Sequence, residues 1–571
     1  MRRHGVSKVA HDLIIKGGTV IDGTGAERYL ADVAVDGEHI TRIGDLSGVD
    51  AGRTIDATGK VVSPGFVDLH THMDAQIGWD PEMKSSSFHG VTTALIGNCG
   101  VTFAPVQPAN HRLLAEMMES VEDIEADAIM DGLSWNWSSY GEYLDMVQSL
   151  NPVANVVGLV GHSPIRFDAM GDKSMDEGVQ PDKKELAHIC RLVRESIEEG
   201  AVGFSTSRFQ GHNVPDGRLT PGTWSDEHEH AAIQRAVVEA GGAGGLFQVA
   251  PDMINRRESE LALFEQAAAE GCHVLFSSGA SPFPGGSLER MGGFLARNNE
   301  EGRRISALCH TRPSGAMFGL LKLTPIQNGL WKELMALPTL EDRLAQLKDP
   351  AFKARLIERS KETGFGVSPD LLHAMGQGDV PDYDLGRQRS LSQMAKEQGR
   401  DPVEVYVDRL IESEGRELWN YWAFGDMLED QWAYMNLPQV IPMLADTGAH
   451  VGIFTDTDST TFLLSQLVRR KGIYSLPEAI HRITQASADV LGLKKRGSVK
   501  EGWIADLNIF DYENLETGYP YFAHDFPHNG GRFIVESTGY LATMVSGQII
   551  VENGKHTRAR PGTVIREFAR G

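Results

Sequence analysis

Residues 64–72 read PGFVDLHTH, an apolar run that ends in His70, Thr71 and His72. Side chains two positions apart on a strand project to the same face, so both imidazoles can meet one ion at the carboxyl end of this strand. Enzymes built on α/β barrels place their sites at that end of the sheet. The segment therefore predicts a buried strand followed by a metal site.

Seven further apolar runs are candidate strands, and helical patterns separate several of them. They are GVTTALIGNCG (90–100), ANVVGLVGH (154–162), GAVGFSTSR (200–208), GGLFQVA (244–250), HVLFSSG (273–279), ISALCH (305–310) and QVIPMLAD (439–446). Between some of them, as in residues 183–200 and 228–242, apolar residues return every three or four positions, which is typical of amphipathic helices. This strand-then-helix order favours an α/β fold of the (β/α)8 TIM-barrel type over an open doubly wound sheet.

The two ends of the chain have a different pattern. Residues 12–44 contain short β-branched runs broken by Gly-Gly and Asp-Gly, and residues 504–511 and 540–555 repeat that style. We expect the ends to pair into one small discontinuous β-sandwich domain. Its two parts would be residues 1–61 and 491–571, with the barrel at residues 62–490.

Two segments of the barrel, 106–150 and 314–435, are longer than ordinary connections. Long strand-to-helix insertions usually form the substrate pocket of such a barrel, so both segments are lid candidates. The first contains the acidic run ESVEDIEADAIMDG (119–132), which we interpret as a solvated helix face.

Composition limits the class of partner. The 571 residues include 41% hydrophobic and 23% charged residues, as in a globular protein with a large core. The formal charge of −24 argues against nucleic acid or a membrane surface as partner and leaves a small-molecule substrate. Four widely spaced cysteines, no signal-peptide core and no run of membrane-spanning length indicate a cytoplasmic protein. Association into a homo-oligomer is left open.

Two other side chains follow predicted strands and can join His70 and His72. Cys99 lies between glycines at a turn, where a thiolate can bridge or complete a metal site; the alternative is an inert buried cysteine. Asp446 follows the last apolar run, where a carboxylate can bind an ion and take a proton from its water. An aspartate shortly before a glycine is otherwise ordinary turn chemistry.

The motifs PGFVDLHTH, GVTTALIGNCG, GAVGFSTSR and RGSVKEGWIADLNIFD together resemble the amidohydrolase superfamily. GNCG with GFST resembles its N-acyl-D-amino-acid deacylase (D-aminoacylase-like) branch, and HTHMDAQIGWDP, GHSPIRFDAMG, TRPSG and LADTGAHVG resemble a larger subgroup of that branch. The resemblance implies a TIM barrel with a β-sandwich domain from both termini. It also implies zinc-dependent hydrolysis of the amide bond of N-acyl-D-amino acids through a metal-bound hydroxide.

The same resemblance implies roles for individual residues. His70 and His72 match the ligands of the first strand, Cys99 the metal-bridging cysteine, and Asp446 the last-strand aspartate that is both ligand and general base and acid. Asp456 in GIFTDTDSTTF is the alternative aspartate, but ADTGAH is closer to the family motif.

The middle strands depart from the family pattern. D-aminoacylases supply two histidine ligands there, whereas this chain has residues 248–250 (Gln-Val-Ala) and 277–279 (Ser-Ser-Gly). A second metal site is therefore doubtful, and we expect one zinc ion per chain. His310, His162 or His212 is a candidate replacement ligand, with a structural or substrate-contacting role as the alternative.

Further polar residues after predicted strands are candidate substrate contacts. They are His162, Arg166, Arg208, His212, His310, Arg312 and His450. An arginine fork suits a substrate carboxylate, with Arg208 the preferred candidate, and His162 or His450 is placed to stabilise an oxyanion.

Two other functions stay open at this point. A cyclic amide, imide or lactone hydrolase would use the same superfamily chemistry, although no lysine ends the middle strands to serve as the carboxylated lysine of hydantoinase-like members. A non-catalytic ligand-binding barrel would account for the missing histidines. The combination of four candidate ligands, His70, His72, Cys99 and Asp446, argues against this function. A barrel without catalytic activity has no need for several metal ligands that converge on one point.

Overall fold

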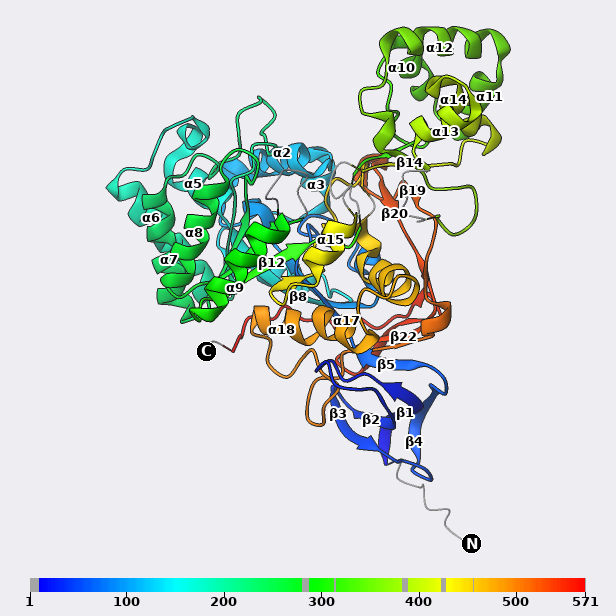
Figure 1. The fold of residues 1–571 in the computed structure, drawn as a ribbon. Coiled ribbons are helices and arrows are strands. Elements are labelled where there is room, and N and C mark those ends of the chain that lie inside the picture. The colour runs from blue at the N-terminus through cyan, green and yellow to red at the C-terminus, as the bar shows by residue number, and fades with distance from the viewer. Residues whose placement is uncertain are drawn as a thin grey trace.

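A closed parallel barrel forms the centre of the computed structural model, which describes residues 10–279, 287–312, 315–382, 389–422, 428–454 and 456–569 (Figure 1). Its eight strands are neighbours in the reverse order of the chain, from β16 to β6. An isolated bridge between Thr71 and Thr447 joins the first and last strands. The strands are β6 (Phe66–Asp68), β7 (Val91–Ile96), β8 (Asn155–Gly161), β9 (Gly203–Ser207), β10 (Leu246–Ala250), β11 (His273–Ser278), β12 (Ile305–Cys309) and β16 (Val440–Ile441).

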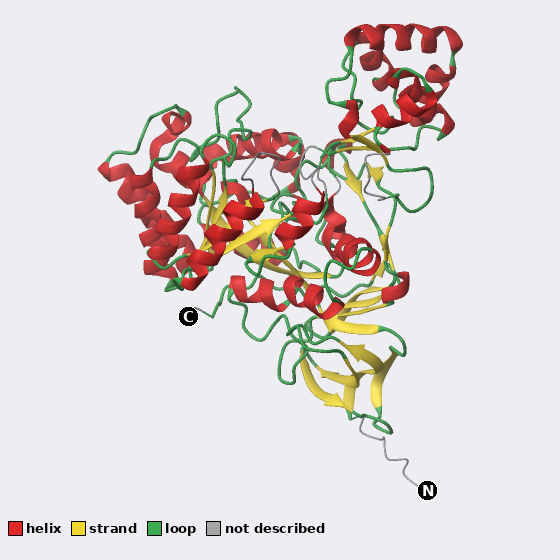
Figure 2. Cartoon of the chain, viewed as in Figure 1, coloured by secondary structure: helices red, strands yellow, loops and turns green. Residues whose placement is uncertain are grey.

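Each of the eight apolar runs contains one of these strands, so the predicted TIM barrel is confirmed. Helices cover the outside of the barrel, as the red ribbons around the yellow strands show (Figure 2). They are α5 (His162–Met170), α6 (Lys183–Glu198), α7 (Glu227–Gly241), α8 (Arg257–Ala269), α9 (Gly292–Glu300), α17 (Leu476–Ile483) and α18 (Gln485–Leu491).

Local sequence explains where these helices begin. Asp182 accepts hydrogen bonds from the backbone N–H groups of Lys184 and Glu185 before α6, and Asp226 accepts one from Glu229 before α7. These side chains satisfy donors that a helix start otherwise leaves free.

Both ends of the chain contribute to one nine-stranded sheet, which confirms their predicted pairing. β5 lies between β1 and β17, and so joins the N-terminal strands to the C-terminal ones immediately before β6 starts the barrel. The strands are β1 (His11–Val20), β2 (Tyr29–Asp36), β3 (His39–Gly44), β4 (Ala51–Asp56), β5 (Val61–Pro64), β17 (Leu507–Phe510), β22 (Tyr540–Val545), β23 (Gln548–Glu552) and β24 (Lys555–His556).

The second insertion forms a helical lobe that stands apart from the barrel, at the upper right of Figure 1. It has an apolar core of its own, which includes Trp331, Phe352, Tyr406 and Trp419. Its elements are β13 (Met317–Phe318), α10 (Gly329–Met335), α11 (Leu340–Lys348), α12 (Pro350–Thr363), β14 (Leu372–Ala374), α13 (Leu391–Gln398), α14 (Pro402–Glu412) and β15 (Trp419–Tyr421). Its role as a lid stays a prediction.

The first insertion packs against the barrel and corrects one expectation. It contains α2 (His111–Glu122), α3 (Ala126–Gly132) and α4 (Tyr140–Ser149). Most acidic residues of the run at 119–132 are exposed, as expected, but Glu122 is 1% exposed. The run is therefore not a uniformly solvated face.

Shorter elements complete the described part of the chain. They are α1 (Lys84–Ser87), α15 (Leu428–Met435), α16 (Ser459–Phe462), β18 (Glu516–Thr517), β19 (Tyr521–Ala523), β20 (Arg532–Ile534) and β21 (Ser537–Thr538). Among the described helices, none combines the length and apolar character needed to cross a bilayer.

Candidate metal centre

Four side chains that the sequence predicted as ligands meet at the carboxyl ends of β6, β7 and β16. We call His70, His72, Cys99 and Asp446 the mouth cluster. Asp446 Oδ1 lies 3.2 Å from His70 Nε2 and 3.2 Å from His72 Nε2. The two Nε2 atoms are 3.4 Å apart, and Cys99 Sγ is 3.4 Å from His70 Nε2. Residues that are far apart in the chain thus converge on one point.

Backbone contacts hold the cluster in place. The His72 N–H donates to the Thr447 carbonyl at 2.7 Å, which fixes the loop of Asp446 against the first strand. Cys99 itself has a φ of 56°, and Gly97 before it has a φ of 81°. A Cβ at Gly97 would lie 2.1 Å from the Leu159 carbonyl oxygen, so only glycine fits this turn.

The cluster has the donor types and spacing of a zinc site. Imidazole nitrogen, thiolate sulfur and carboxylate oxygen are the usual zinc ligands in proteins. A tetrahedron with bonds of about 2.0 Å has edges of about 3.3 Å, close to the 3.2–3.4 Å separations found here. His70, His72 and Cys99 are fully buried, whereas a quarter of the Asp446 side chain is exposed. The residues present therefore fit a metal ion that is open to solvent on the side of Asp446.

Charges in the mouth cluster compensate one another. Burial opposes protonation of His70, but Cys99 and Asp446 outweigh it and raise the pKa of His70 to about 9. Burial alone would raise the pKa of Asp446, yet hydrogen bonds and positive charge from both imidazoles hold it well below its usual value. The pKa of Cys99 is lowered because His70 and His72 outweigh its burial. A cation at this point would take over the role of these imidazolium charges.

The carboxyl ends of β10 and β11 carry no histidine, and their polar groups bond within the protein. Gln248 Oε1 accepts a hydrogen bond from the Cys99 N–H at 3.1 Å. Ser278 Oγ is hydrogen-bonded to the Tyr434 hydroxyl at 2.7 Å. Gln248 thus supports the turn that carries Cys99.

Three predicted substrate contacts lie in a different buried group, between the barrel strands and the outer helices. His162 Nε2 and Arg166 Nε lie 2.8 and 3.0 Å from Glu229 Oε1 of α7. Arg208 Nε donates to Glu260 of α8 at 2.7 Å, and its NH1 lies 3.0 Å from His230 Nε2. We call these residues the outer cluster: His162, Arg166, Arg208, Glu229, His230 and Glu260. Both arginines are paired with carboxylates of the protein itself, and within the described part of the chain no ion pair joins them to the mouth cluster.

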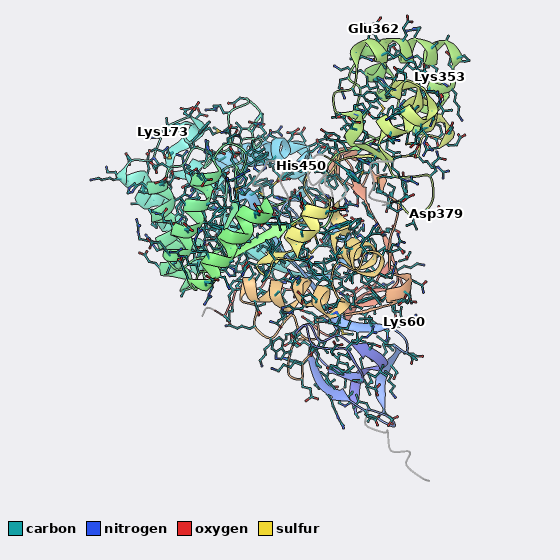
Figure 3. The ribbon with its side chains drawn as sticks, viewed as in Figure 1. Lys60, Lys173, Lys353, Glu362, Asp379 and His450 are labelled. Atoms are coloured by element: carbon teal, nitrogen blue, oxygen red, sulfur yellow. The ribbon has the colours of Figure 1, made fainter. Side chains whose placement is uncertain are left out.

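His212 and His450 lie near the mouth cluster. His212 Nδ1 is 2.8 Å from Ser207 Oγ. Burial lowers the pKa of His212 to about 4, and its electrostatic neighbours include His72, Asp446 and His450. His450 is partly exposed beside the end of α2, with its ring against Phe454 (Figure 3).

The other candidates follow β12. Arg312 NH2 lies 3.1 Å from the buried Asp458 Oδ1. The His310 carbonyl accepts a hydrogen bond from Gln431 at 2.8 Å, and His310 is partly exposed. The side chain of Asp456, the alternative aspartate, lies outside the described residues.

Glu122 is a site residue that the sequence interpretation missed. Its Oε1 lies 3.0 Å from His72 Nδ1, and both side chains are buried. Burial opposes ionisation of Glu122, but the adjacent His72 outweighs it and lowers the pKa of the carboxyl. The signal was present: Glu122 follows Leu114 and Met118 at intervals of four, which puts it on the buried face of α2.

Comparison with known proteins identifies the family. A family model described as the amidohydrolase family matches residues 53–551. The chain belongs to this family. Its predicted membership of the D-aminoacylase-like branch is confirmed, and with it an amidohydrolase acting on a C–N bond other than a peptide bond.

Three relatives illustrate the likeness. An N-acyl-D-aspartate deacylase from Alcaligenes xylosoxydans xylosoxydans is 25% identical over 568 residues, which cover 97% of this chain and 95% of that protein. The solved structure of a D-aminoacylase has a TM-score of 0.66 at 22% identity, covering 98% of this chain and 100% of the other. An N-acyl-D-glutamate deacylase from Bordetella bronchiseptica, solved with zinc and a phosphonate inhibitor, has a TM-score of 0.63 at 24% identity over the same shares. The two structures share the fold of this amidohydrolase.

Proposed function

We propose that this amidohydrolase cleaves the amide bond of N-acyl-D-amino acids at one zinc ion held by the mouth cluster. The observation that carries the proposal is the position of Asp446 Oδ1, 3.2 Å from the Nε2 atoms of both histidines and partly exposed to solvent. Similarity to an N-acyl-D-aspartate deacylase over nearly the whole chain supports this substrate class.

One ion per chain is the stoichiometry that the contacts favour. Within the described residues, His70, His72 and Cys99 are close enough to share one metal ion, and Asp446 Oδ1 joins the same group at 3.2 Å from both imidazoles. Gln248 and Ser278 lie at the strand ends where the resembled family has histidine ligands, and each bonds to another part of the protein. His162, a candidate replacement ligand, has both ring nitrogens within 2.9 Å of Thr206 or Glu229.

Asp446 is the proposed proton carrier. Zinc, when bound, lowers the pKa of a coordinated water to about 7 and polarises the substrate carbonyl. Asp446 accepts the proton of the attacking water, because its carboxylate is held ionised and reaches both the ligand atoms and solvent. It then donates this proton to the nitrogen of the leaving amino acid, so the carboxylate is restored for the next turnover.

His212 and His450 are the proposed substrate contacts at the entrance. His212 is neutral above a pH of about 4, so its imidazole can form hydrogen bonds without adding charge. His450 is partly exposed near Glu122 and is placed to stabilise negative charge on the carbonyl oxygen. His212 therefore offers a neutral polar group with Asp446 and His450 among its electrostatic neighbours.

The test is zinc content followed by a substrate panel. Elemental analysis of protein purified without added metal or chelator should give about one zinc per chain. The panel compares N-acetyl-D-aspartate, N-acetyl-D-glutamate and N-acetyl-D-leucine with their L-enantiomers, a hydantoin, dihydroorotate and a lactone. We expect release of a free D-amino acid from at least one N-acyl-D compound.

Other outcomes contradict separate parts of the proposal. Two zinc ions per chain would contradict the single site. Turnover confined to a cyclic amide or lactone would replace the substrate class but keep the metal chemistry. No zinc at purification and none taken up on titration would favour a non-catalytic ligand-binding barrel.

A further inference from the structure

The two ring nitrogens of His72 face different groups. Nε2 points toward the mouth cluster, 3.2 Å from Asp446 Oδ1 and 3.4 Å from His70 Nε2. Nδ1 lies 3.0 Å from Oε1 of Glu122 on the opposite side of the ring. His72 therefore lies between the proposed metal position and a second, fully buried carboxylate.

His70 has no equivalent partner. Among the described residues, Asp446 is the one carboxylate that pairs with His70, and it does so at Nε2. The two histidines of the same strand end thus differ: Glu122 pairs with the ring of His72, whereas Asp68 accepts a hydrogen bond from the main-chain N–H of His70. This asymmetry indicates a role for Glu122 that is specific to one ligand.

Packing of α2 and a main-chain contact hold Glu122 at this point. Met118 and Leu114, one and two turns earlier, are buried on the same face of the helix. The main-chain carbonyl of Glu122 accepts a hydrogen bond from the Val451 N–H at 3.2 Å. Val451 is five residues beyond Asp446, so the end of α2 contacts both His72 and the loop that supplies the aspartate.

Imidazole binds a metal through a nitrogen that carries no proton, and the other nitrogen then carries it. A carboxylate beside that second nitrogen favours the proton there and fixes the orientation of the ring. An isolated buried carboxylate is costly, so a 1% exposed Glu122 is retained only where a donor compensates it. His72 Nδ1, 3.0 Å from Glu122 Oε1, is the ring nitrogen that pairs with this carboxylate.

We propose that Glu122 is a positioning residue that keeps the proton of His72 on Nδ1 and presents Nε2 to the zinc ion. The inference rests on the proposed function, because it presupposes a metal in the mouth cluster. The first insertion would then have a structural role in addition to the predicted lid role. It supplies the carboxylate that orients a metal ligand at the end of the first barrel strand.

The test measures zinc affinity of the full-length protein, without any assay of hydrolysis. Metal-free wild type, Glu122→Ala and Glu122→Gln are titrated with zinc in competition with a chromophoric chelator. Glu119→Ala and Glu119→Gln are matched controls, since Glu119 lies in the same helix and is exposed. His70→Ala reports whether zinc occupies the mouth cluster at all. Thermal unfolding of each metal-free variant reports whether it is folded.

We expect zinc affinity to fall by about 10- to 100-fold in Glu122→Ala, which is the range for loss of a group that orients a metal ligand. Glu122→Gln keeps the volume and an acceptor oxygen but not the charge, so it should lose less affinity than the alanine variant. The Glu119 variants should bind zinc like the wild type. If Glu122→Ala does not fold, a loss of zinc affinity in the folded Glu122→Gln variant supports the proposal instead.

Two results overturn the proposal and differ in what else they affect. Wild-type zinc affinity in every folded Glu122 variant, with affinity lost in His70→Ala, rejects the positioning role and leaves the proposed function intact. Unchanged affinity in His70→Ala, or no zinc binding by the wild type, rejects the metal assignment itself and the inference with it.

Discussion

The mouth cluster and the outer cluster come from the same kind of sequence but do different work. In each, a histidine or an arginine directly follows an apolar barrel strand. In the mouth cluster the side chains converge on one another, and Asp446 is partly open to solvent. In the outer cluster they pair with carboxylates of α7 and α8 and are buried. A polar residue after a strand therefore indicates a site only when its partners leave room for a ligand.

The pKa shifts of the histidines separate the two clusters in the same way. In the mouth cluster, anionic neighbours outweigh burial and raise the pKa of His70 and His72. In the outer cluster, burial and the neighbouring arginines lower the pKa of His162 and His230. The first arrangement suits the binding of a cation, and the second keeps neutral rings in a packed layer.

The largest effect is expected at the mouth cluster. Asp446→Asn removes the proposed proton acceptor and a metal ligand while conserving volume. We expect kcat/KM for the best N-acyl-D substrate to fall by about 10³-fold or more, with a melting temperature near that of the wild type. A variant within tenfold of the wild-type rate would exclude this role for Asp446.

The next effect is expected in the outer cluster and concerns stability rather than turnover. Glu229→Gln leaves Arg166 without its buried counter-charge, and breaking such a pair typically costs about 3–5 kcal/mol of unfolding free energy. Urea unfolding should show this loss while zinc per chain stays at the wild-type value. Glu227→Gln is the matched control, because Glu227 lies in the same first turn of α7 and is exposed.

Loss of bound zinc in Glu229→Gln without a loss of unfolding free energy would mean that the mouth cluster and the outer cluster belong to one functional site. That result would also restore Arg166 and His162 as candidates for substrate contact.

The smallest effect is expected in the pH dependence of stability. His230 has a folded-state pKa well below 6.5, so the unfolded chain binds this proton first as the pH falls. Stability from the neutral ring is thus complete above about pH 6.5 and is lost below it, by up to about 1.4 kcal/mol per pH unit for one group. His230→Gln should show a shallower fall in unfolding free energy between pH 6.5 and 5.

His228→Gln provides the control for this measurement, since His228 is exposed on the same helix. An equal change in slope in both variants would mean that burial in the outer cluster is not the cause.

Sequence reasoning predicted the barrel and its metal ligands because both depend on short-range patterns. Eight apolar runs with helical segments between several of them predict a closed parallel sheet, and each run contains a barrel strand. His70 and His72 lie just beyond β6, which ends at Asp68, and Asp446 follows β16, so all three lie at the same end of the barrel. The domain boundaries, and the roles of the ligands, stay predictions.

By itself, then, the sequence determined the barrel, the pairing of its two ends in one sheet, and the set of side chains at the barrel mouth. Only the tertiary structure decided which polar residues pair with one another. Glu122 reaches His72 from a helix fifty residues further along the chain, and Arg208 pairs with Glu260 of α8 across a similar separation. Strand and helix periodicity fixes the face of the element on which a side chain lies. The partner of that side chain depends on how separate elements pack. Burial then decides whether a charged side chain becomes part of a site or of a structural ion pair.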